Sequence, residues 1–170
     1  MAVDKKAWGD DNQHSCNAQV TNHKVIVRTD DSMTSQPSIE EGLDFTPRFD
    51  SNGLIPAIAQ DAKTGQILMV AYMNKEALEQ TRQCGYAVYF SRSRSKLWRK
   101  GEESGHVQRV EQILVDCDQD CLVLKVNVDQ GQCHTGHQSC FYRAVNKGLP
   151  GKLDLVAEKV YDPKQVYRAG

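Results

Sequence analysis

The hydrophobic pattern of the 170-residue chain is clearest between positions 54 and 145. Short runs rich in β-branched and aromatic residues, bounded by Gly, Asn, Asp or Ser, are typical of β-strands. Runs of this kind occupy positions 55–60, 66–72, 86–91, 107–115, 122–128 and 141–145. The first two are joined by Lys63-Thr64-Gly65, which predicts a β-hairpin.

Positions 75–84 have the pattern of a helix. Asn74 is a suitable N-cap in front of this segment, and Gly85 is suited to end it. Positions 92–105 carry many charges and show no hydrophobic periodicity, so we expect a loop there. Long loops inside compact domains are often functional. One main helix among about seven strands predicts a β-rich α+β fold in a single domain.

The two ends of the chain differ from this central part. Positions 1–41 are polar apart from a short apolar run at 25–27, which indicates an N-terminal extension and linker. The domain is expected over 42–145. Positions 146–170 form a C-terminal tail for which the pattern predicts no structure.

Composition narrows the class of protein. The chain has 21 Lys and Arg against 22 Asp and Glu, a net charge of −1, so it lacks the basic excess of a nucleic-acid-binding protein. No apolar run approaches the length of a membrane span, and the N-terminus lacks the apolar stretch of a secretory signal. We therefore expect a cytoplasmic protein whose six cysteines are metal ligands, nucleophiles or buried side chains rather than disulfides.

Three carboxylates alternate along one short segment: Asp116, Asp118 and Asp120. Such hard oxygen ligands suit Mg²⁺ or Ca²⁺. An EF-hand loop is excluded because Cys121 and Asn127 stand where it needs Gly and Glu. On a straight strand the outer two carboxylates would lie roughly 13 Å apart, so we expect the segment to curl at a strand end. A solvated acidic turn without a metal is the alternative.

Cys117, Cys133 and Cys140 are spaced by 16 and seven residues, without a C-x-x-C pair. Three protein ligands with an open fourth position are typical of a catalytic zinc, which lowers the pKa of a bound water to about 7. Each cysteine taken alone is more often a small buried apolar residue than a metal ligand.

The segment 130–140 contains two glycines and two histidines between two thiols, a composition poorly suited to a core. A hydrolytic zinc site needs a proton shuttle, and His134 or His137 could supply it near neutral pH. Neighbouring side chains rarely converge on one ion, so His134, next to Cys133, is better interpreted as a base than as a fourth ligand.

Basic residues are concentrated at 92–100, with an indole among them. This combination can bind a phosphate and offers a stacking face, although a charge run on its own is more often a solvated, mobile basic loop. Two glutamates and a Ser-Gly pair directly follow, which favours a small anion over an extended nucleic acid. The candidate substrate contacts are Arg92, Arg94, Trp98, Lys100, Glu102, Ser104 and His137.

Several short motifs between about Leu43 and Arg143, taken in order, resemble the phosphoribosyl-AMP cyclohydrolase family of histidine biosynthesis. They are Gly53-Leu54-Ile55-Pro56-Ala57, Val70-Ala71-Tyr72-Met73-Asn74, Ser91-Arg92-Ser93-Arg94, Leu97-Trp98-Arg99-Lys100-Gly101-Glu102, Asp116-Cys117-Asp118-Gln119-Asp120, Cys133-His134-Thr135-Gly136 and Ser139-Cys140-Phe141-Tyr142.

The resemblance implies a bent mixed β-sheet that forms a pseudobarrel, in a homodimer whose zinc ligands are shared across the subunit interface. It implies one Zn²⁺ and one Mg²⁺ per subunit and a catalytic role for His134. The implied zinc ligands are Cys117, Cys133 and Cys140, and the implied magnesium ligands are Asp116, Asp118 and Asp120.

The implied reaction is the hydrolytic opening of the purine six-membered ring of 1-(5-phosphoribosyl)-AMP. Zinc-activated water would cleave the N1–C6 bond and give the formimino-carboxamide ribotide. The sequence departs from the family pattern at Glu103, where Thr is expected, and at Gln138, where Arg is common. The 24 residues after position 146 are too few for the pyrophosphohydrolase domain fused to some relatives, so we expect a monofunctional chain.

Two other functions were weighed against this one. A nucleobase deaminase needs H-x-E and P-C-x-x-C motifs, and neither occurs. A zinc-stabilised interaction module would use the thiols to hold loops together and the basic segment to bind an acidic partner. That module would unfold when zinc is removed, whereas a cyclohydrolase would lose turnover first.

Overall fold

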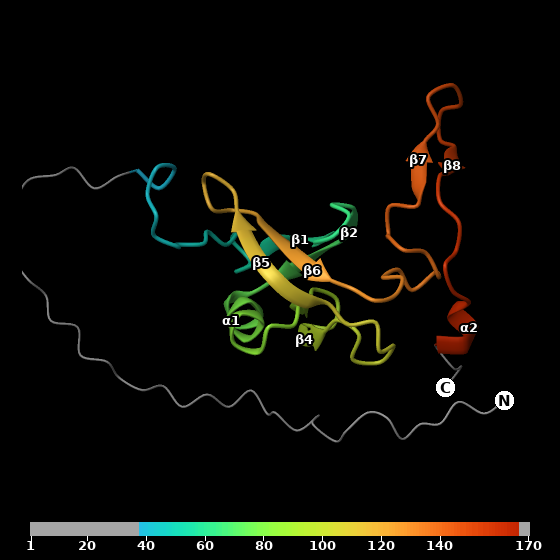
Figure 1. Cartoon of the computed structure of the whole chain (residues 1–170). Helices are drawn as coiled ribbons and strands as arrows, with labels where there is room; N and C mark the ends of the chain where they lie inside the picture. Colours follow the sequence, from blue (N-terminus) through green and yellow to red (C-terminus); the bar gives the residue numbers. More distant parts are fainter. Residues whose placement is uncertain (1–37, 167–170) are drawn as a thin grey trace, which may run out of the picture. The chain divides into compact units, whose positions relative to one another are not determined.

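The computed structural model describes residues 38–166, so the apolar run at 25–27 lies outside the described residues. Figure 1 shows the elements in chain order. They are β1 (Ile55–Asp61), β2 (Ile67–Met73), α1 (Lys75–Cys84), β3 (Val88–Ser91), β4 (Lys96–Arg99), β5 (Arg109–Val115), β6 (Leu122–Asn127), β7 (Arg143–Val145), β8 (Leu153–Leu155) and α2 (Pro163–Val166).

Six strands form one sheet in the order β4-β3-β2-β1-β6-β5. Only β1 and β6 run parallel, and the other neighbours are antiparallel, so the sheet is mixed. Register shifts in β1 and β5 add local twist. The sheet is curled into a half-barrel with one main helix, which confirms the predicted fold class.

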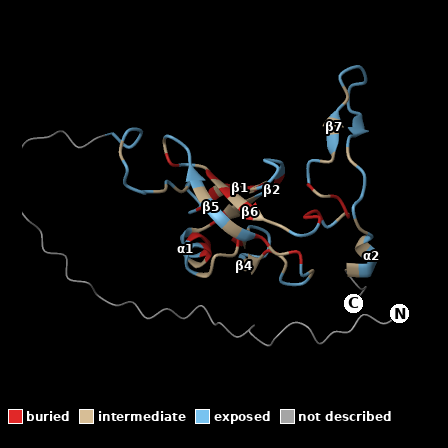
Figure 2. Cartoon of the chain, viewed as in Figure 1, coloured by how far each residue is buried: buried red, intermediate tan, exposed pale blue. Residues whose placement is uncertain are grey.

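The hydrophobic core is built on the two parallel strands, β1 and β6, in which buried and less buried residues alternate. Every second residue of β1 and of β6 is buried, as expected for strands with one face toward the core. Figure 2 shows this burial on the central strands and on one side of α1. Full burial of an Ile or Leu side chain contributes about 1.5–3 kcal/mol to stability. The central strands therefore form a rigid base for the loops at their two ends.

The predicted helix has the predicted ends. The Asn74 side chain accepts a hydrogen bond from the N–H of Ala77 at 2.8 Å, and Gly85 ends the helix with φ 72°. The buried Thr81 hydroxyl bonds to the backbone of Val88 in β3. These contacts set the direction in which the chain leaves α1 toward β3 and β4.

The expectation of a loop over 92–105 is wrong at Lys96–Arg99, which form edge strand β4. Charged side chains on a short edge strand hide its alternation, although they protect the edge from further pairing. Trp98 lies opposite Tyr89 of β3, with ring centroids 5.0 Å apart. The indole is thereby fixed by the sheet.

Beyond the sheet, the chain has structure that the pattern did not predict. Strand β8 and helix α2 lie in the segment 146–170, for which the pattern predicted no structure, and β8 pairs with β7, which lies within the strand expected at 141–145. Strand β7 is shorter than the expected 141–145, and β3 is shorter than the expected 86–91. Within residues 38–166, no helix is long and apolar enough to cross a membrane.

Candidate functional site

The predicted metal ligands lie in two loops at opposite ends of β6. We call residues 116–120, between β5 and β6, the acidic loop, and residues 130–140, after β6, the cysteine loop. Because β6 is extended over six residues, it separates the two loops by about 16–20 Å.

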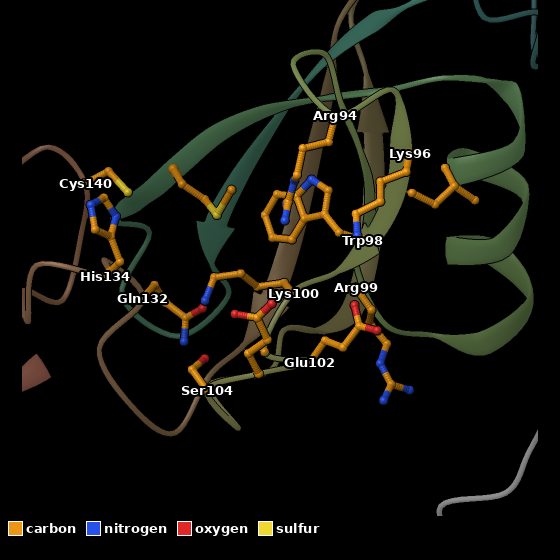
Figure 3. Close-up of a pocket in the computed structure, with 14 residues that line it drawn as sticks. Arg94, Lys96, Trp98, Arg99, Lys100, Glu102, Ser104, Gln132, His134 and Cys140 are labelled. Atoms are coloured by element: carbon orange, nitrogen blue, oxygen red, sulfur yellow. The ribbon is translucent and has the colours of Figure 1, made fainter. Parts of the chain in front are cut away.

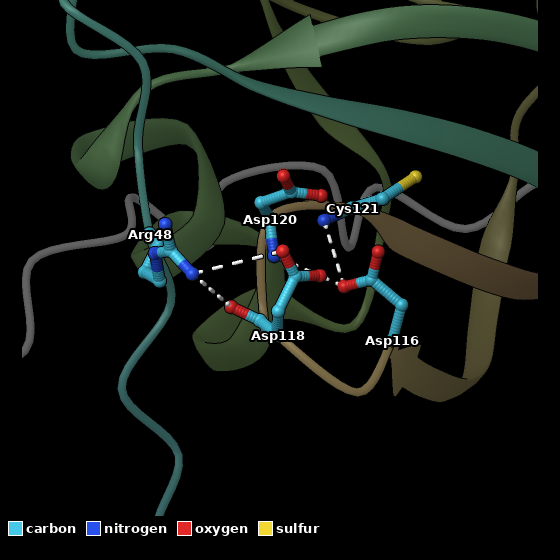
Figure 4. Close-up of polar contacts among 5 residues, drawn as sticks. All are labelled: Arg48, Asp116, Asp118, Asp120 and Cys121. Atoms are coloured by element: carbon cyan, nitrogen blue, oxygen red, sulfur yellow. Dashed lines mark hydrogen bonds and ion pairs between the residues drawn. The ribbon is translucent and has the colours of Figure 1, made fainter. Parts of the chain in front are cut away.

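The acidic loop brings its three aspartates together. Asp116, Asp118 and Asp120 each offer a carboxylate oxygen, and these oxygens lie within 4.8 Å of one another. The turn forms because one Asp116 oxygen accepts the N–H groups of Asp120 and Cys121, both at 3.0 Å (Figure 4). The segment is therefore curled at a strand end, as the sequence predicted.

Mutual repulsion is the main electrostatic feature of this loop. The charge of Asp118, desolvation and the charge of Asp116 raise the pKa of Asp120. Arg48 offsets part of the repulsion through an exposed ion pair with Asp118 at 3.6 Å. A bound divalent cation would relieve the rest, so the three carboxylates fit a hard metal ion.

The cysteine loop brings two thiols together. Cys133 is buried, and the Cys140 N–H donates to the carbonyl of Leu68 at 2.8 Å, next to the start of β2. Cys140 is exposed as a whole residue, yet desolvation of its thiol raises its pKa to about 12, and the neighbouring Cys133 acts in the same direction. A metal ion bound here has to displace a proton, so its affinity rises with pH.

Cys117 lies in the acidic loop and is exposed, far from the other two thiols. Among residues 38–166, the acidic cluster is the one group of three potential ligands close enough to share an ion. One chain therefore assembles two of the three predicted zinc ligands. The two thiols fit zinc chemically, and a three-thiol site would need its third ligand from outside this pair.

A cavity of about 400 Å³ adjoins the cysteine loop. Its size is within the range of small-molecule sites. Figure 3 shows His134 and Cys140 at one side of the cavity, with Trp98 and Arg94 across it. Its lining includes five candidate contacts from the basic segment and turn: Arg94, Trp98, Lys100, Glu102 and Ser104. Sequence reasoning missed Met69, Leu97 and Gln132, which carry no charge to mark them.

A buried chain of hydrogen bonds connects this cavity to the core. The Tyr89 hydroxyl donates to Gln108 at 2.7 Å, and the Gln108 side-chain N–H donates to Gln132 at 3.2 Å. Gln132 in turn donates to the carbonyl of Gln130. These bonds attach the cysteine loop to the sheet beneath Trp98.

Lys100 is the buried cation of the cavity. Its ammonium group donates to the carbonyl of His106 at 3.2 Å. Desolvation lowers its pKa, while the nearby Cys140 and Cys133 act in the opposite direction. Lys100 therefore places a positive charge close to the two thiols.

Two predicted substrate contacts do not line the cavity. The Arg92 guanidinium lies 4.0 Å from the centre of the Tyr72 ring, a cation–π contact. His137 is buried and stacks on Tyr142 with centroids 3.7 Å apart. Its Nδ1 lies 2.9 Å from the Thr135 hydroxyl. His137 is thus packed inside the loop, whereas His134 faces the cavity.

The two departures from the family pattern differ in position. Glu103 lines the cavity, so a carboxylate stands where the family pattern has a hydroxyl. Gln138 does not line it, and its carbonyl accepts the N–H of Gln132 at 3.0 Å. A change of side chain at 138 leaves this backbone bond in place.

Comparison with known proteins gives one consistent result. A family model described as phosphoribosyl-AMP cyclohydrolase matches residues 69–142, which include both loops and the basic segment. A Nitrobacter winogradskyi protein named phosphoribosyl-AMP cyclohydrolase is 54% identical over 138 residues, 79% of this chain and 95% of the relative. A protein of the same name from Methanococcoides burtonii is 56% identical over 122 residues, which are 72% of this chain and 96% of the relative.

Proposed function

The chain belongs to the phosphoribosyl-AMP cyclohydrolase family, hydrolases of histidine biosynthesis, and from that premise we propose that it hydrolyses the N1–C6 bond of 1-(5-phosphoribosyl)-AMP. Water adds to C6 of the purine, the C6–N1 bond breaks, and N1 receives a proton. The product is the formimino-carboxamide ribotide, and no oxidant or reductant is needed.

The observation that carries this proposal is the composition of the cavity. Arg94 and Lys100 provide positive charge for phosphate groups, and Trp98 provides an aromatic face for a purine. Cys140 and His134 line the same space, although about 40 residues separate them from this basic segment. A nucleotide bound to the first group would therefore present its base to the second.

His134 is proposed as the general base. It is exposed and borders the cavity beside Cys140. Imidazole is the side chain best suited to accept and return a proton near neutral pH. His134 would take a proton from the attacking water and return it to N1 as the ring opens.

Cys133 and Cys140 are proposed to hold zinc together with Cys117 of the partner subunit of a homodimer, one ion per subunit. Zinc supplies Lewis acidity and lowers the pKa of a bound water to about 7. Support comes from the separation of Cys117 from the other two thiols within one chain. A partner that contributes Cys117 also brings its own acidic loop toward the cavity.

The acidic loop is proposed to hold one Mg²⁺ per subunit through Asp116, Asp118 and Asp120. Mg²⁺ prefers carboxylate and water oxygens, and it commonly contacts substrate phosphates as well. The loop would thereby add a phosphate or ribose contact across the subunit interface.

The test is a spectroscopic ring-opening assay with 1-(5-phosphoribosyl)-AMP, with chelator and metal add-back. Cys133→Ser should lose zinc and activity together, while circular dichroism remains that of a folded protein. Cys84→Ser is the matched control, because Cys84 lies at the end of α1, outside the cavity lining. Full activity of Cys133→Ser without zinc would refute the proposed site.

The shared site has its own test. Cys117→Ser and Cys133→Ser chains should each be inactive alone. In a mixed dimer one of the two sites contains both substitutions and the other contains neither. Random mixing should therefore restore about a quarter of the native activity. Mixed dimers that form and remain inactive would exclude sharing of the zinc ligands.

A further inference from the structure

Residues 159–161, which we call the C-terminal strap, pack against the cysteine loop, although they lie outside the residues matched by the family model. The N–H groups of Val160 and Tyr161 both donate to the carbonyl of Gly136, at 2.8 and 3.2 Å. Lys159 forms a β-bridge with His137. The strap therefore adds backbone hydrogen bonds to the cysteine loop.

The Tyr161 side chain makes the contact closest to a predicted metal ligand. Its hydroxyl donates to the main-chain carbonyl of Cys133 at 2.5 Å. This bond constrains the peptide group of Cys133, whose sulfur lies 2.9 Å from the Thr135 hydroxyl. Tyr161 therefore constrains Cys133 through its backbone.

Tyr161 is also connected to the basic turn of the cavity. Its ring packs edge-on against His106, with centroids 4.7 Å apart. His106 Nδ1 lies 2.7 Å from the carbonyl of Gly131, at the start of the cysteine loop, and the His106 carbonyl accepts from Lys100. One side chain thus braces both segments that border the cavity.

The strap can pack closely against the cysteine loop because two residues of the loop, Gly131 and Gly136, have no side chain. A Cβ on Gly131 would lie 2.6 Å from a methyl group of Val160. A Cβ on Gly136 would overlap the carbonyl oxygen of Tyr161, and Gly136 also has φ +96°, which favours glycine. The strap therefore explains why glycine is needed at the end of the Cys133-His134-Thr135-Gly136 motif.

We propose that Tyr161 is a positioning residue for the metal centre: it holds the Cys133 peptide and His106 in place, so that the cysteine loop is ordered before a metal binds. This proposal rests on the proposed function for the zinc role of Cys133. Ordering a loop in advance strengthens binding, because the entropy of ordering is not lost at the binding step.

The test compares Tyr161→Phe and Tyr161→Ala with the native protein. The rate of zinc loss to a chelator should rise roughly threefold to tenfold in Tyr161→Phe, which lacks only the hydroxyl, and further in Tyr161→Ala. In metal-free protein, alkylation of the buried Cys133, followed by peptide mass spectrometry, should accelerate. Alkylation of Cys84, at the end of α1 and outside the cavity lining, should stay constant and serves as the internal reference.

Tyr86→Phe is the matched control, since it removes a tyrosine hydroxyl outside the cavity lining while keeping the ring that Arg99 contacts. A purely structural role for Tyr161 would lower the melting temperature and leave both zinc loss and the ratio of Cys133 to Cys84 alkylation unchanged. That result in Tyr161→Phe would overturn the proposal, even if Tyr161→Ala did not fold. If the native chain bound no zinc, the proposed function would fail, and the alkylation ratio would still test the strap.

Discussion

The acidic loop and the cysteine loop, at the two ends of β6, gather their ligands in different ways. The acidic loop places three carboxylates within 4.8 Å from a stretch of five residues in one chain. The cysteine loop pairs two thiols, and the third predicted ligand, Cys117, lies in the acidic loop itself. A contiguous motif needs only a turn to form, whereas a dispersed one depends on tertiary structure and, in the proposed site, on a second chain.

The two loops share one property: each is fixed by a segment distant in sequence. The buried Gln119 side chain donates to the carbonyl of Asp44 and accepts the N–H of Thr46, at 2.8 and 2.7 Å. Tyr161 does the same for the cysteine loop through Cys133. Residues 44–46 and Tyr161, which lie near the two ends of the domain, therefore brace the loops at the two ends of β6.

Cys140→Ser should have the largest effect. It removes one of the two thiols that one chain supplies, so bound zinc and ring-opening activity should both fall to background. Elemental analysis and the spectroscopic assay measure the two losses. Calorimetric Mg²⁺ binding should persist, because the acidic loop is complete without Cys140. Retention of one zinc per subunit would contradict the ligand set.

His134→Ala should separate chemistry from metal binding at the cysteine loop. We expect zinc content to be retained and the turnover rate to fall by roughly 10² to 10⁴, since a positioned acid-base group contributes that much. His137→Ala is a useful contrast, because His137 is buried in the loop and should affect stability more than proton transfer. Unchanged kinetics in His134→Ala would remove it from the mechanism.

Asp118→Asn should affect the acidic loop alone. Removing a residue that only hydrogen-bonds to a metal ligand typically lowers metal affinity about 10–100-fold. Removing a ligand itself should therefore raise the Mg²⁺ concentration required for activity by at least that factor. Zinc content should not change. Asp129→Asn is the control, an exposed carboxylate that pairs with Arg109 away from the loop. An unaltered Mg²⁺ titration for Asp118→Asn would argue against the cluster.

Gln119→Ala should have the smallest effect. It removes two hydrogen bonds to the segment at 44–46 and should lower the free energy of unfolding by about 1–3 kcal/mol. Denaturant titration measures the change, with the exposed Gln112→Ala as control. Zinc content should be unaffected. A loss of zinc as large as that of Cys140→Ser would show that Gln119 is needed to place Cys117 at the proposed zinc site.

The parts of the fold that the sequence predicted are those with a periodic pattern. Strands β1 and β6 could be predicted because burial alternates along them, and helix α1 because Asn74 and Gly85 mark its ends. Strand β2 could be predicted because it is a short apolar run that follows the turn Lys63-Thr64-Gly65. Strand β4 was missed because its exposed edge carries charges, and β8 was missed because all its residues are exposed. Both are held by pairing with a neighbouring strand, which no local pattern records.

The sequence by itself determined the chemical groups of this protein and the one cluster that a local turn assembles, the acidic loop. Only the tertiary structure decided that Trp98 and Lys100 share a cavity with His134, that His137 is packed inside the loop, and that Tyr161 reaches Cys133. The physical reason is that side-chain chemistry and turns are local properties. Proximity between distant segments depends on strand pairing and packing over the whole sheet.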